Sequence, residues 1–332
     1  MSAPDLSVLA GRGHVGAVDL GGTKIFAAVV TPDGRISHRA TELVGDDHEP
    51  QAVVERIAMA MSEATRAAGL GPANLDAMGI CAPSPVVFET GVVVHAPNLG
   101  WHNFPLKDAL TTRLSLPVAV ENDVRAAVIA ENAAGAGRGV ADWVALWPGT
   151  GIGGGVVLNG QLWRGASNSA GEFGHMTVDA DGPLCGCGAR GHLEAVASRT
   201  GICNELARRV AAGEGTILTE TVGADLHQAS GADLGRAWRA GDRMVGEVVE
   251  QAAHYLSVGI ASIANCLNPE LVVLGGGVTE GLGDPFVALI AEQVKGHPME
   301  AATDPLRLVR CQLGDDAGLI GAALVARLAV SS

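Results

Sequence analysis

The chain has 332 residues, of which 48% are apolar and only 3% aromatic, and its formal net charge is −14. This length is enough for two lobes and a sizeable core, and the abundance of small residues is typical of a tightly wound α/β protein. The acidic balance argues against the basic surface that binds nucleic acid or an anionic membrane. Any phosphate group must therefore be bound locally, by backbone amides, a metal ion or a few basic side chains.

The cysteines and the N-terminal residues indicate the compartment. Six cysteines are present, and only Cys185 and Cys187 are closely spaced, so they do not resemble a disulfide framework. Residues 1–13 lack the basic start and apolar centre of a signal peptide. No apolar stretch is long and charge-free enough to cross a bilayer. We therefore expect a cytoplasmic protein without a membrane or nucleic-acid partner.

The first half of the chain predicts strands and helices in alternation. A strand at 15–20 runs into Gly21-Gly22-Thr23, and a second strand follows at 25–30. Apolar residues at helical spacing predict a helix over about 50–68. Further predicted elements are a strand at 75–80, a strand at 118–120 that leads into Glu121-Asn122-Asp123, and an Ala-rich helix to about 134.

The second half begins in the same way. A strand at 143–147, a Gly/Thr turn at 148–151 and a strand at 153–158 are predicted, with a hairpin turn at Asn159-Gly160. A long helix at about 242–267, a strand at 271–274, and a final strand and helix from about 306 to 330 follow. This repeat predicts a duplicated α/β lobe with a ligand cleft between the copies. We expect a smaller lobe of residues 1–122 plus about 312–332, and a larger lobe of residues 123–311.

The sequence DLGGTK at 19–24 has the composition of a phosphate-binding turn. Gly21 and Gly22 let backbone amides approach an oxyanion, Thr23 adds a hydroxyl donor, and Lys24 adds a positive charge. Asp19 can hold Mg²⁺ directly or through water. The spacing is not that of a P-loop, and an ordinary glycine hairpin remains an open alternative.

Two further glycine-rich turns extend the same hypothesis. Gly149, Thr150 and Gly151 form the matching turn of the second half, so that two such turns can clamp one polyphosphate. Gly275, Gly276 and Gly277 follow a buried strand and can let a flat base or ribose lie against the backbone. A plain turn is the alternative at both places.

Asp123 is the candidate general base. It follows an apolar strand, and a carboxylate at such a strand end can accept a hydroxyl proton as the oxygen attacks phosphorus. Asn122 can orient the same sugar hydroxyls. Both residue types are also favoured as helix N-caps, and the two roles are compatible.

A Gly-rich segment carries the spacing H-x9-C-x-C-x4-H of a tetrahedral structural zinc site. The four candidate ligands are His175, Cys185, Cys187 and His192. Glu172 and Glu194 lie in the same segment and can accept hydrogen bonds from hydroxyl groups. A closed four-ligand site leaves no open position for water, so the metal would position these carboxylates. Free thiols are the alternative.

These motifs together resemble the ROK family of sugar kinases and repressors, within the hexokinase–actin–Hsp70 superfold. The matching stretches are DLGGTK, APN at 96–98 with Trp101, END at 121–123, GTGIGGG at 149–155, and AGEFGHM to GHLEAVAS over 170–198. The resemblance implies two lobes of duplicated ribonuclease H-like or actin-like topology, with a cleft between them and a zinc-stapled loop. It is greatest to bacterial glucokinases, and it implies phosphorylation of the 6-hydroxyl of a hexose with ATP, Mg²⁺ and a structural Zn²⁺. We also expect a homodimer or homotetramer.

The resemblance also assigns roles to single residues. It casts Asp123 as the base and the following residues as sugar contacts: Ser84, Asn98, Asn122, Glu172, His175 and Glu194. Three positions depart from the family pattern. His192 stands where the family has a third cysteine, Ser84 stands where a glycine follows Pro83, and Arg125 stands where Asn is common.

Other functions stay open at this point. An amino-sugar or N-acylhexosamine kinase, acting on glucosamine, N-acetylglucosamine or N-acetylmannosamine, would use the same residues. A sugar-responsive repressor would need a DNA-binding domain, and about a dozen residues before the first strand are too few for a helix-turn-helix. A non-catalytic sugar-binding regulator is disfavoured by Asp123 and the two phosphate turns. The donor, ATP or polyphosphate, is also open.

Overall fold

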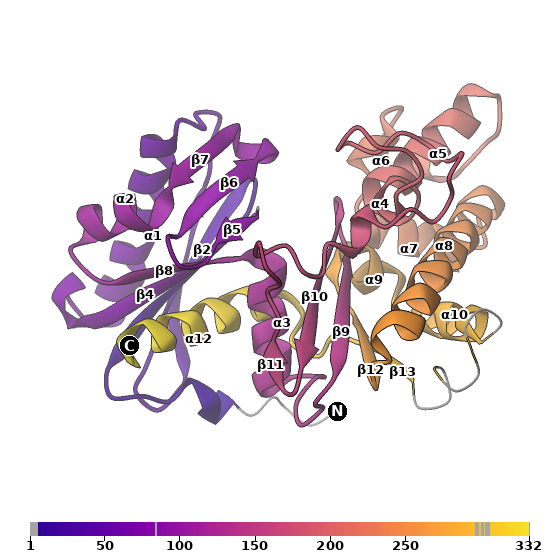
Figure 1. The fold of residues 1–332 in the computed structure, drawn as a ribbon. Coiled ribbons are helices and arrows are strands. Elements are labelled where there is room, and N and C mark those ends of the chain that lie inside the picture. The colour runs from indigo at the N-terminus through magenta and orange to yellow at the C-terminus, as the bar shows by residue number, and fades with distance from the viewer. Residues whose placement is uncertain (1–5, 84, 296–298, 300–301, 303–305, 332) are drawn as a thin grey trace. The chain divides into compact units, whose positions relative to one another are not determined.

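The chain folds into two compact units, each built around its own sheet (Figure 1). The computed structural model describes residues 6–83, 85–295, 299, 302 and 306–331. Unit 1 comprises Met1–Arg138, Arg164–Ala170 and Asp315–Ser332, and unit 2 comprises Gly139–Trp163 and Gly171–Gly314. Unit 1 therefore includes residues 123–138, which the division expected from the sequence places in the C-terminal lobe.

The main sheet of unit 1 is mixed and has the order β3-β2-β1-β4-β8. Its strands are β1 (His14–Leu20), β2 (Lys24–Val30), β3 (Ile36–Leu43), β4 (Leu75–Ala82) and β8 (Val118–Asn122). The first three strands pair antiparallel, whereas β4 pairs parallel with both β1 and β8. The apolar runs of β1 and β4 are almost wholly buried, as expected for central strands. The register sets Asp19 beside Cys81, at the ends of β1 and β4.

Helices and a small second sheet complete unit 1. The helices are α1 (Pro50–Ala67), α2 (Leu106–Leu114), α3 (Asp123–Ala134) and α12 (Ala317–Ser331), with short 3-10 turns η1 (Leu6–Leu9), η2 (Pro72–Asn74) and η3 (Pro97–Leu99). The Ala- and Gly-rich α12 packs against β1, β4 and α3 (Figure 1). The small sheet consists of β5 (Val86–Val87), β6 (Val92–Ala96) and β7 (Trp101–Pro105), in that order.

The sheet of unit 2 has the order β11-β10-β9-β12-β13. Its strands are β9 (Trp143–Pro148), β10 (Ile152–Leu158), β11 (Gln161–Leu162), β12 (Leu271–Leu274) and β13 (Arg307–Arg310). β9, β10 and β11 pair antiparallel, and β12 pairs parallel with β9 and β13. In chain order, both main sheets therefore run third, second, first, fourth, fifth. The Gly-Thr turns at 21–23 and 149–151 join the first two strands of their respective sheets.

Unit 2 is otherwise helical. Its helices are α4 (Leu193–Ala197), α5 (Arg199–Ala211), α6 (Leu218–Val222), α7 (Gly231–Arg239), α8 (Arg243–Leu267), α9 (Gly276–Leu282) and α10 (Asp284–Val294), and its 3-10 turns are η4 (Phe173–His175) and η5 (Leu226–Gln228). The 3-10 turn η6 (Gly314–Asp316) precedes α12. Helix α8 is capped by Asp242, whose carboxylate accepts the Val245 N–H at 2.9 Å. Its buried side chains recur at helical spacing and pack on α4, α5 and α10.

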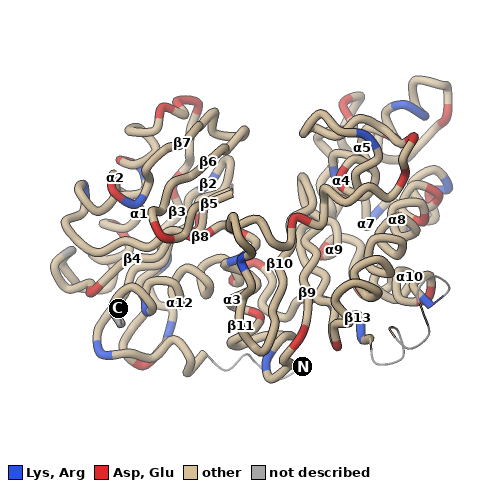
Figure 2. The backbone as a smooth tube through the Cα atoms, in the orientation of Figure 1, with Lys and Arg blue, Asp and Glu red and all other residues tan. Residues whose placement is uncertain are grey.

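Two further features of the described residues concern hydropathy and charge. No helix among them is long and apolar enough to cross a membrane. Lys and Arg positions are interspersed with Asp and Glu positions on both units (Figure 2).

Candidate active site and metal cluster

Asp123 is the first residue of α3 and follows directly on the end of β8. The side-chain oxygen of Asn122 caps this helix by accepting the Arg125 N–H at 3.0 Å. Its amide group, Nδ2, donates to Asp123 Oδ1 at 2.8 Å, and the Val124 N–H donates to the same oxygen at 2.8 Å. Asn122 thus both caps the helix and positions the carboxylate of Asp123, whose Oδ1 accepts two hydrogen bonds.

The electrostatic surroundings of Asp123 raise the pKa of its carboxyl group. Desolvation by burial, with a smaller contribution from the charge of Asp19, raises the pKa of Asp123 to about 6. The hydrogen bonds from Val124 and Asn122 oppose this rise. A carboxyl group with a pKa near 6 is a stronger base than an ordinary one and is still mostly ionised at neutral pH.

Asp19 lies at the end of β1, where the first glycine-rich turn begins. Burial raises the pKa of Asp19, and the Cys81 thiol partly offsets this by donating to Asp19 Oδ1 at 3.3 Å. A β-carbon added at Gly318, in the first turn of α12, would lie 2.4 Å from Asp19 Oδ2. The start of α12 therefore approaches this carboxylate closely because residue 318 has no side chain.

The turn after Asp19 is closed by a backbone hydrogen bond, and two of its side chains are exposed to solvent. The Gly21 N–H donates to the Lys24 carbonyl at 2.9 Å and closes the turn, and Thr23 and Lys24 are exposed. A β-carbon on Gly22 would lie 3.6 Å from the side chain of Asn98, a candidate sugar contact on η3. Unit 1 thus brings the turn and Asn98 together.

The second glycine-rich turn is braced by the start of α5. The Arg199 N–H donates to the Gly149 carbonyl at 2.8 Å, and the Thr200 hydroxyl donates to the Thr150 carbonyl at 2.7 Å. Glu194 Oε2 accepts the Ile152 N–H at 2.9 Å, directly after the turn. A β-carbon on Gly151 would lie 2.3 Å from that carboxylate oxygen, so a side chain here would displace the carboxylate of Glu194.

The run Gly275-Gly276-Gly277 lies beside the same turn. A β-carbon at Gly275 would lie 2.4 Å from the indole ring of Trp147, and one at Gly276 would lie 2.6 Å from the Pro148 carbonyl oxygen. Gly276 also has a φ of 80°, which favours glycine. The run is not a free turn, because helix α9 begins at Gly276.

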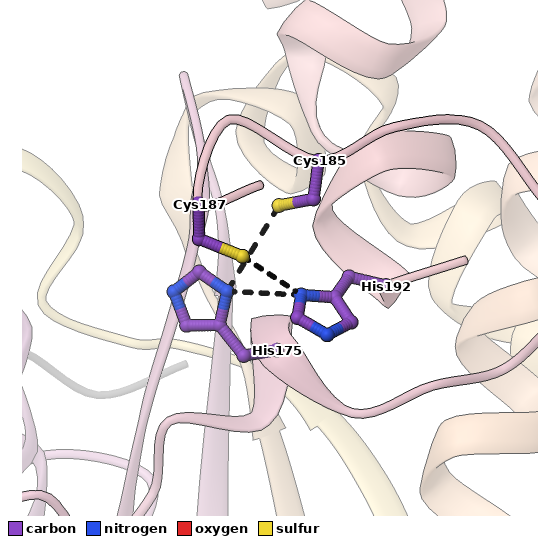
Figure 3. Close-up of side chains that lie close together, drawn as sticks. All are labelled: His175, Cys185, Cys187 and His192. Carbon is purple, nitrogen blue, oxygen red and sulfur yellow. Dashed lines mark hydrogen bonds between the residues drawn. The ribbon is translucent and has the colours of Figure 1, made fainter. Parts of the chain in front are cut away.

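His175, Cys185, Cys187 and His192 lie together as the spacing predicts (Figure 3). Their candidate ligand atoms all lie within 4.8 Å of one another. The two Nδ1 atoms of the histidines are 3.3 Å apart, Cys187 Sγ is 3.2 Å from His192 Nδ1, and Cys185 Sγ is 3.9 Å from His175 Nδ1. Among the described residues this is the one group of three or more such side chains that could hold a metal ion.

The donor set and its distances fit a tetrahedral zinc ion. Zn²⁺ binds sulfur at about 2.3 Å and imidazole nitrogen at about 2.0–2.1 Å, which puts neighbouring donors roughly 3.3–3.8 Å apart. Three of the donor separations, 3.2, 3.3 and 3.9 Å, lie close to that range, and all of them are within 4.8 Å. Two thiolates and two neutral imidazoles would also balance the charge of the ion.

The four candidate metal ligands and the second glycine-rich turn are connected through Glu194. Helix α4 begins directly after His192 and carries this residue. While one oxygen of Glu194 accepts the Ile152 N–H, the other lies 3.6 Å from Cys185 Sγ, within reach of a weak thiol hydrogen bond. Glu172, by contrast, is exposed at the start of η4, where its carbonyl accepts the His175 N–H at 3.1 Å.

One predicted site residue lies outside the described residues, and three residues that contact the candidate turns were not predicted. Ser84 lies outside the described residues. Cys81, Arg199 and Thr200 contact the candidate turns, but no motif marks them, because each contact joins residues far apart in the chain. The strand pattern could have found Cys81, since β1 and β4 are parallel neighbours that end level with each other.

Comparison with known proteins gives a family model, curated relatives and solved structures that agree with one another. The model of the ROK family matches residues 15–328. The chain is 36% identical over 312 residues to a glucokinase from Halalkalibacterium halodurans, covering 93% of each chain. It is 34% identical over 314 residues to an N-acetylmannosamine kinase from Shigella boydii, covering 94% of this chain and 97% of the relative. The solved structure of a ROK family glucokinase from Streptomyces griseus, in complex with glucose and AMPPNP, is 33% identical, with a TM-score of 0.81 and coverage of 95% of this chain and 100% of that one.

Proposed function

The chain belongs to the ROK family and is a sugar kinase, and we propose that it transfers the γ-phosphoryl group of ATP to the 6-hydroxyl of glucose. The observation that supports this most is the carboxyl group of Asp123. Hydrogen bonds from Asn122 and Val124 hold it through Oδ1, and burial raises its pKa to about 6. The similarity to glucokinases supports glucose as the acceptor.

In the proposed mechanism Asp123 is the general base. Its carboxylate accepts the proton of the 6-hydroxyl as the sugar oxygen attacks the γ-phosphorus, and the bond from that phosphorus to the ADP oxygen breaks. The pKa of about 6 keeps the carboxylate mostly ionised at neutral pH and makes it a better proton acceptor than an ordinary Asp. Asn122 fixes the carboxylate, and Asn98, Glu172, His175 and Glu194 orient the sugar.

We assign phosphate binding to the two glycine-rich turns. Gly21, Gly22, Thr23 and Lys24 form the first, and Gly149, Thr150 and Gly151 form the second. Asp19 would hold Mg²⁺, which neutralises charge on the phosphate oxygens when it is bound. Gly275, Gly276 and Gly277 would accept the nucleoside. The like strand order of the two sheets supports a duplicated, actin-like topology with one phosphate turn in each copy.

We further propose that the metal cluster holds a structural Zn²⁺. His175, Cys185, Cys187 and His192 would supply all four ligands, so the ion would stiffen the loop and would not activate water. The same loop carries Glu172 and leads into the helix of Glu194, which explains how the metal would serve sugar binding. A homodimer or homotetramer and a cytoplasmic location stay predictions.

A second candidate is an N-acylhexosamine or amino-sugar kinase. The identity to N-acetylmannosamine kinase, 34%, is close to the 36% to glucokinase, so overall similarity does not separate the two acceptors. The chemistry of both is the same, and only the contacts around the second carbon of the sugar differ.

A sugar panel separates these candidates. ADP release by the purified enzyme would be followed by a coupled assay with glucose, mannose, glucosamine, N-acetylglucosamine, N-acetylmannosamine, allose and fructose, with ATP or polyphosphate as donor. The highest kcat/KM is expected for glucose with ATP. A higher kcat/KM for an N-acyl sugar would select the second candidate, and no sugar-dependent release with any donor would reject the kinase.

A further inference from the structure

A buried ion pair lies directly beside the proposed base. The guanidinium of Arg164 contacts Glu121 Oε2, and the Glu121 side chain is fully buried while that of Arg164 is 22% exposed. The other carboxylate oxygen of Glu121 accepts the backbone N–H of Asn122 at 2.9 Å. One carboxylate thus joins Arg164 to the backbone of the residue that precedes Asp123.

Arg164 is itself held in place. Its guanidinium carbon lies 4.0 Å from the centre of the Phe88 ring, which is the geometry of a cation–π contact. A planar guanidinium suits both this stacking and the hydrogen bond to a carboxylate, whereas a lysine ammonium suits neither as well. The position of Glu121 is therefore set by a side chain that has little freedom of its own.

A second contact ties the same segment to α3. The Arg125 guanidinium donates to the Asn168 carbonyl, and Arg125 is buried at 2% exposure. Arg164–Ala170 packs with unit 1, although the residues on both sides of it belong to unit 2. This segment, called the strap from here on, continues through Gly171 into Glu172.

We propose that Glu121 and Arg164 act as one positioning device for the proposed base, through the strap and the backbone of Asn122. A buried carboxylate is costly unless a countercharge compensates it, so removal of Arg164 leaves Glu121 as an unpaired buried charge, whereas removal of Glu121 leaves the partly exposed Arg164 without its countercharge. Such a charge would relax by moving the strap or the end of β8. Asn122 and Asp123 would move with that strand end, because Asn122 is the last residue of β8 and Asp123 follows it directly. The pair touches neither sugar nor nucleotide in this account.

The proposal rests on Asp123 as the base, and a double-mutant cycle tests it. The variants are Glu121→Gln, Arg164→Gln, their combination, and the conservative Arg164→Lys. The matched control is Arg209→Gln, which breaks an ion pair with Glu214 and Glu247 in unit 2. Each is measured for kcat, KM for sugar and KM for ATP, with circular dichroism and thermal melting to establish folding.

The device predicts a specific pattern. Each single Gln variant should lose about 10–100-fold in kcat, as expected for a displaced reacting group, with KM for ATP unchanged. The double variant should lie within about threefold of the worse single variant, because the two side chains act together. Arg164→Lys should retain more kcat than Arg164→Gln, and the Arg209 control should stay within about twofold of wild type.

Other outcomes overturn the proposal. Folded single variants with wild-type kcat would contradict it, and so would losses that multiply in the double variant. If Glu121→Gln does not fold, the Arg164 series still decides: equal kcat for wild type, Lys and Gln would reject the device. Failure of the proposed function is distinct from these results, because it would appear as an active Asp123→Asn variant.

Discussion

Replacement of Asp123 by Asn should inactivate the enzyme and stabilise it at neutral pH. Asn has the same shape, and its carbonyl oxygen can accept the hydrogen bonds from Asn122 and Val124 that Asp123 Oδ1 accepts now. It cannot accept the sugar proton, and the loss of a general base costs about 10²–10⁴-fold in rate. The stability change follows from the raised pKa of the carboxyl group.

The magnitude can be worked out from that pKa. Because the pKa of Asp123 rises from 3.8 to about 6 on folding, the folded protein binds this proton more tightly than the unfolded chain. Stability therefore falls as the pH rises from about 4 to about 6, by about 1.4 kcal/mol per unit or about 3 kcal/mol in all. Asp123 is partly exposed, so solvent screening reduces the expected gain of Asp123→Asn to about 1–2 kcal/mol.

The assay is a pair of thermal melts at two pH values. At about pH 7.5 the Asn variant should melt at least about 2 °C above wild type. At about pH 4.5 the linkage relation leaves about a third of the free-energy difference, because wild-type Asp123 is then largely protonated. The exposed Glu63→Gln serves as the control for loss of one negative charge. An Asn variant that melts below wild type at neutral pH, or a gain that does not depend on pH, would refute the reasoning.

Three further predictions concern the pH profile, the second turn and the metal. The value of kcat/KM should fall as the pH drops below about 6, because protonation of Asp123 removes the base. If kcat/KM falls only near pH 4, the base does not have the raised pKa of Asp123. Gly151→Ala would place a methyl group 2.3 Å from Glu194 and should raise KM for ATP several-fold, whereas the control Gly215→Ala, in the same unit but outside the proposed site, has open space and should not. Equal KM values would contradict the role of this turn. Protein purified without chelator should contain about one zinc per chain by elemental analysis. The Cys185→Ser variant should lose this zinc, whereas the control variant Cys203→Ser, at a buried cysteine outside the site, should keep it. Equal metal content in both variants would remove Cys185 from the site.

The elements that the sequence predicted well are those with strong local patterns. The strand Leu271–Leu274 has the expected bounds, because its four apolar residues are bounded by polar residues and glycine. The long helix Arg243–Leu267 begins within a residue of its expected start, since Asp242 is a strong N-cap. The proximity of the four candidate metal ligands was also predictable, because all four lie within 18 residues of sequence.

The elements that the sequence did not predict depend on tertiary contacts. The strand Ile36–Leu43 has little alternation of apolar and polar residues, and it forms because β2 offers it an edge. The small sheet of β5, β6 and β7 consists of short strands that no pattern separates from loop. Likewise, Glu121 and Arg164 are 43 residues apart, so neither residue signals that the other compensates its charge.

The regiochemistry of the product tests the central claim most directly. Wild-type enzyme would be incubated with ATP, Mg²⁺ and glucose, and the phosphorylated product identified by phosphorus NMR, with Asp123→Asn as the parallel sample. The account predicts glucose phosphorylated at the 6-hydroxyl by wild type and no sugar phosphate from the variant. A phosphate on another hydroxyl, or equal product from the variant, would contradict the assignment of Asp123 as the base for the 6-hydroxyl.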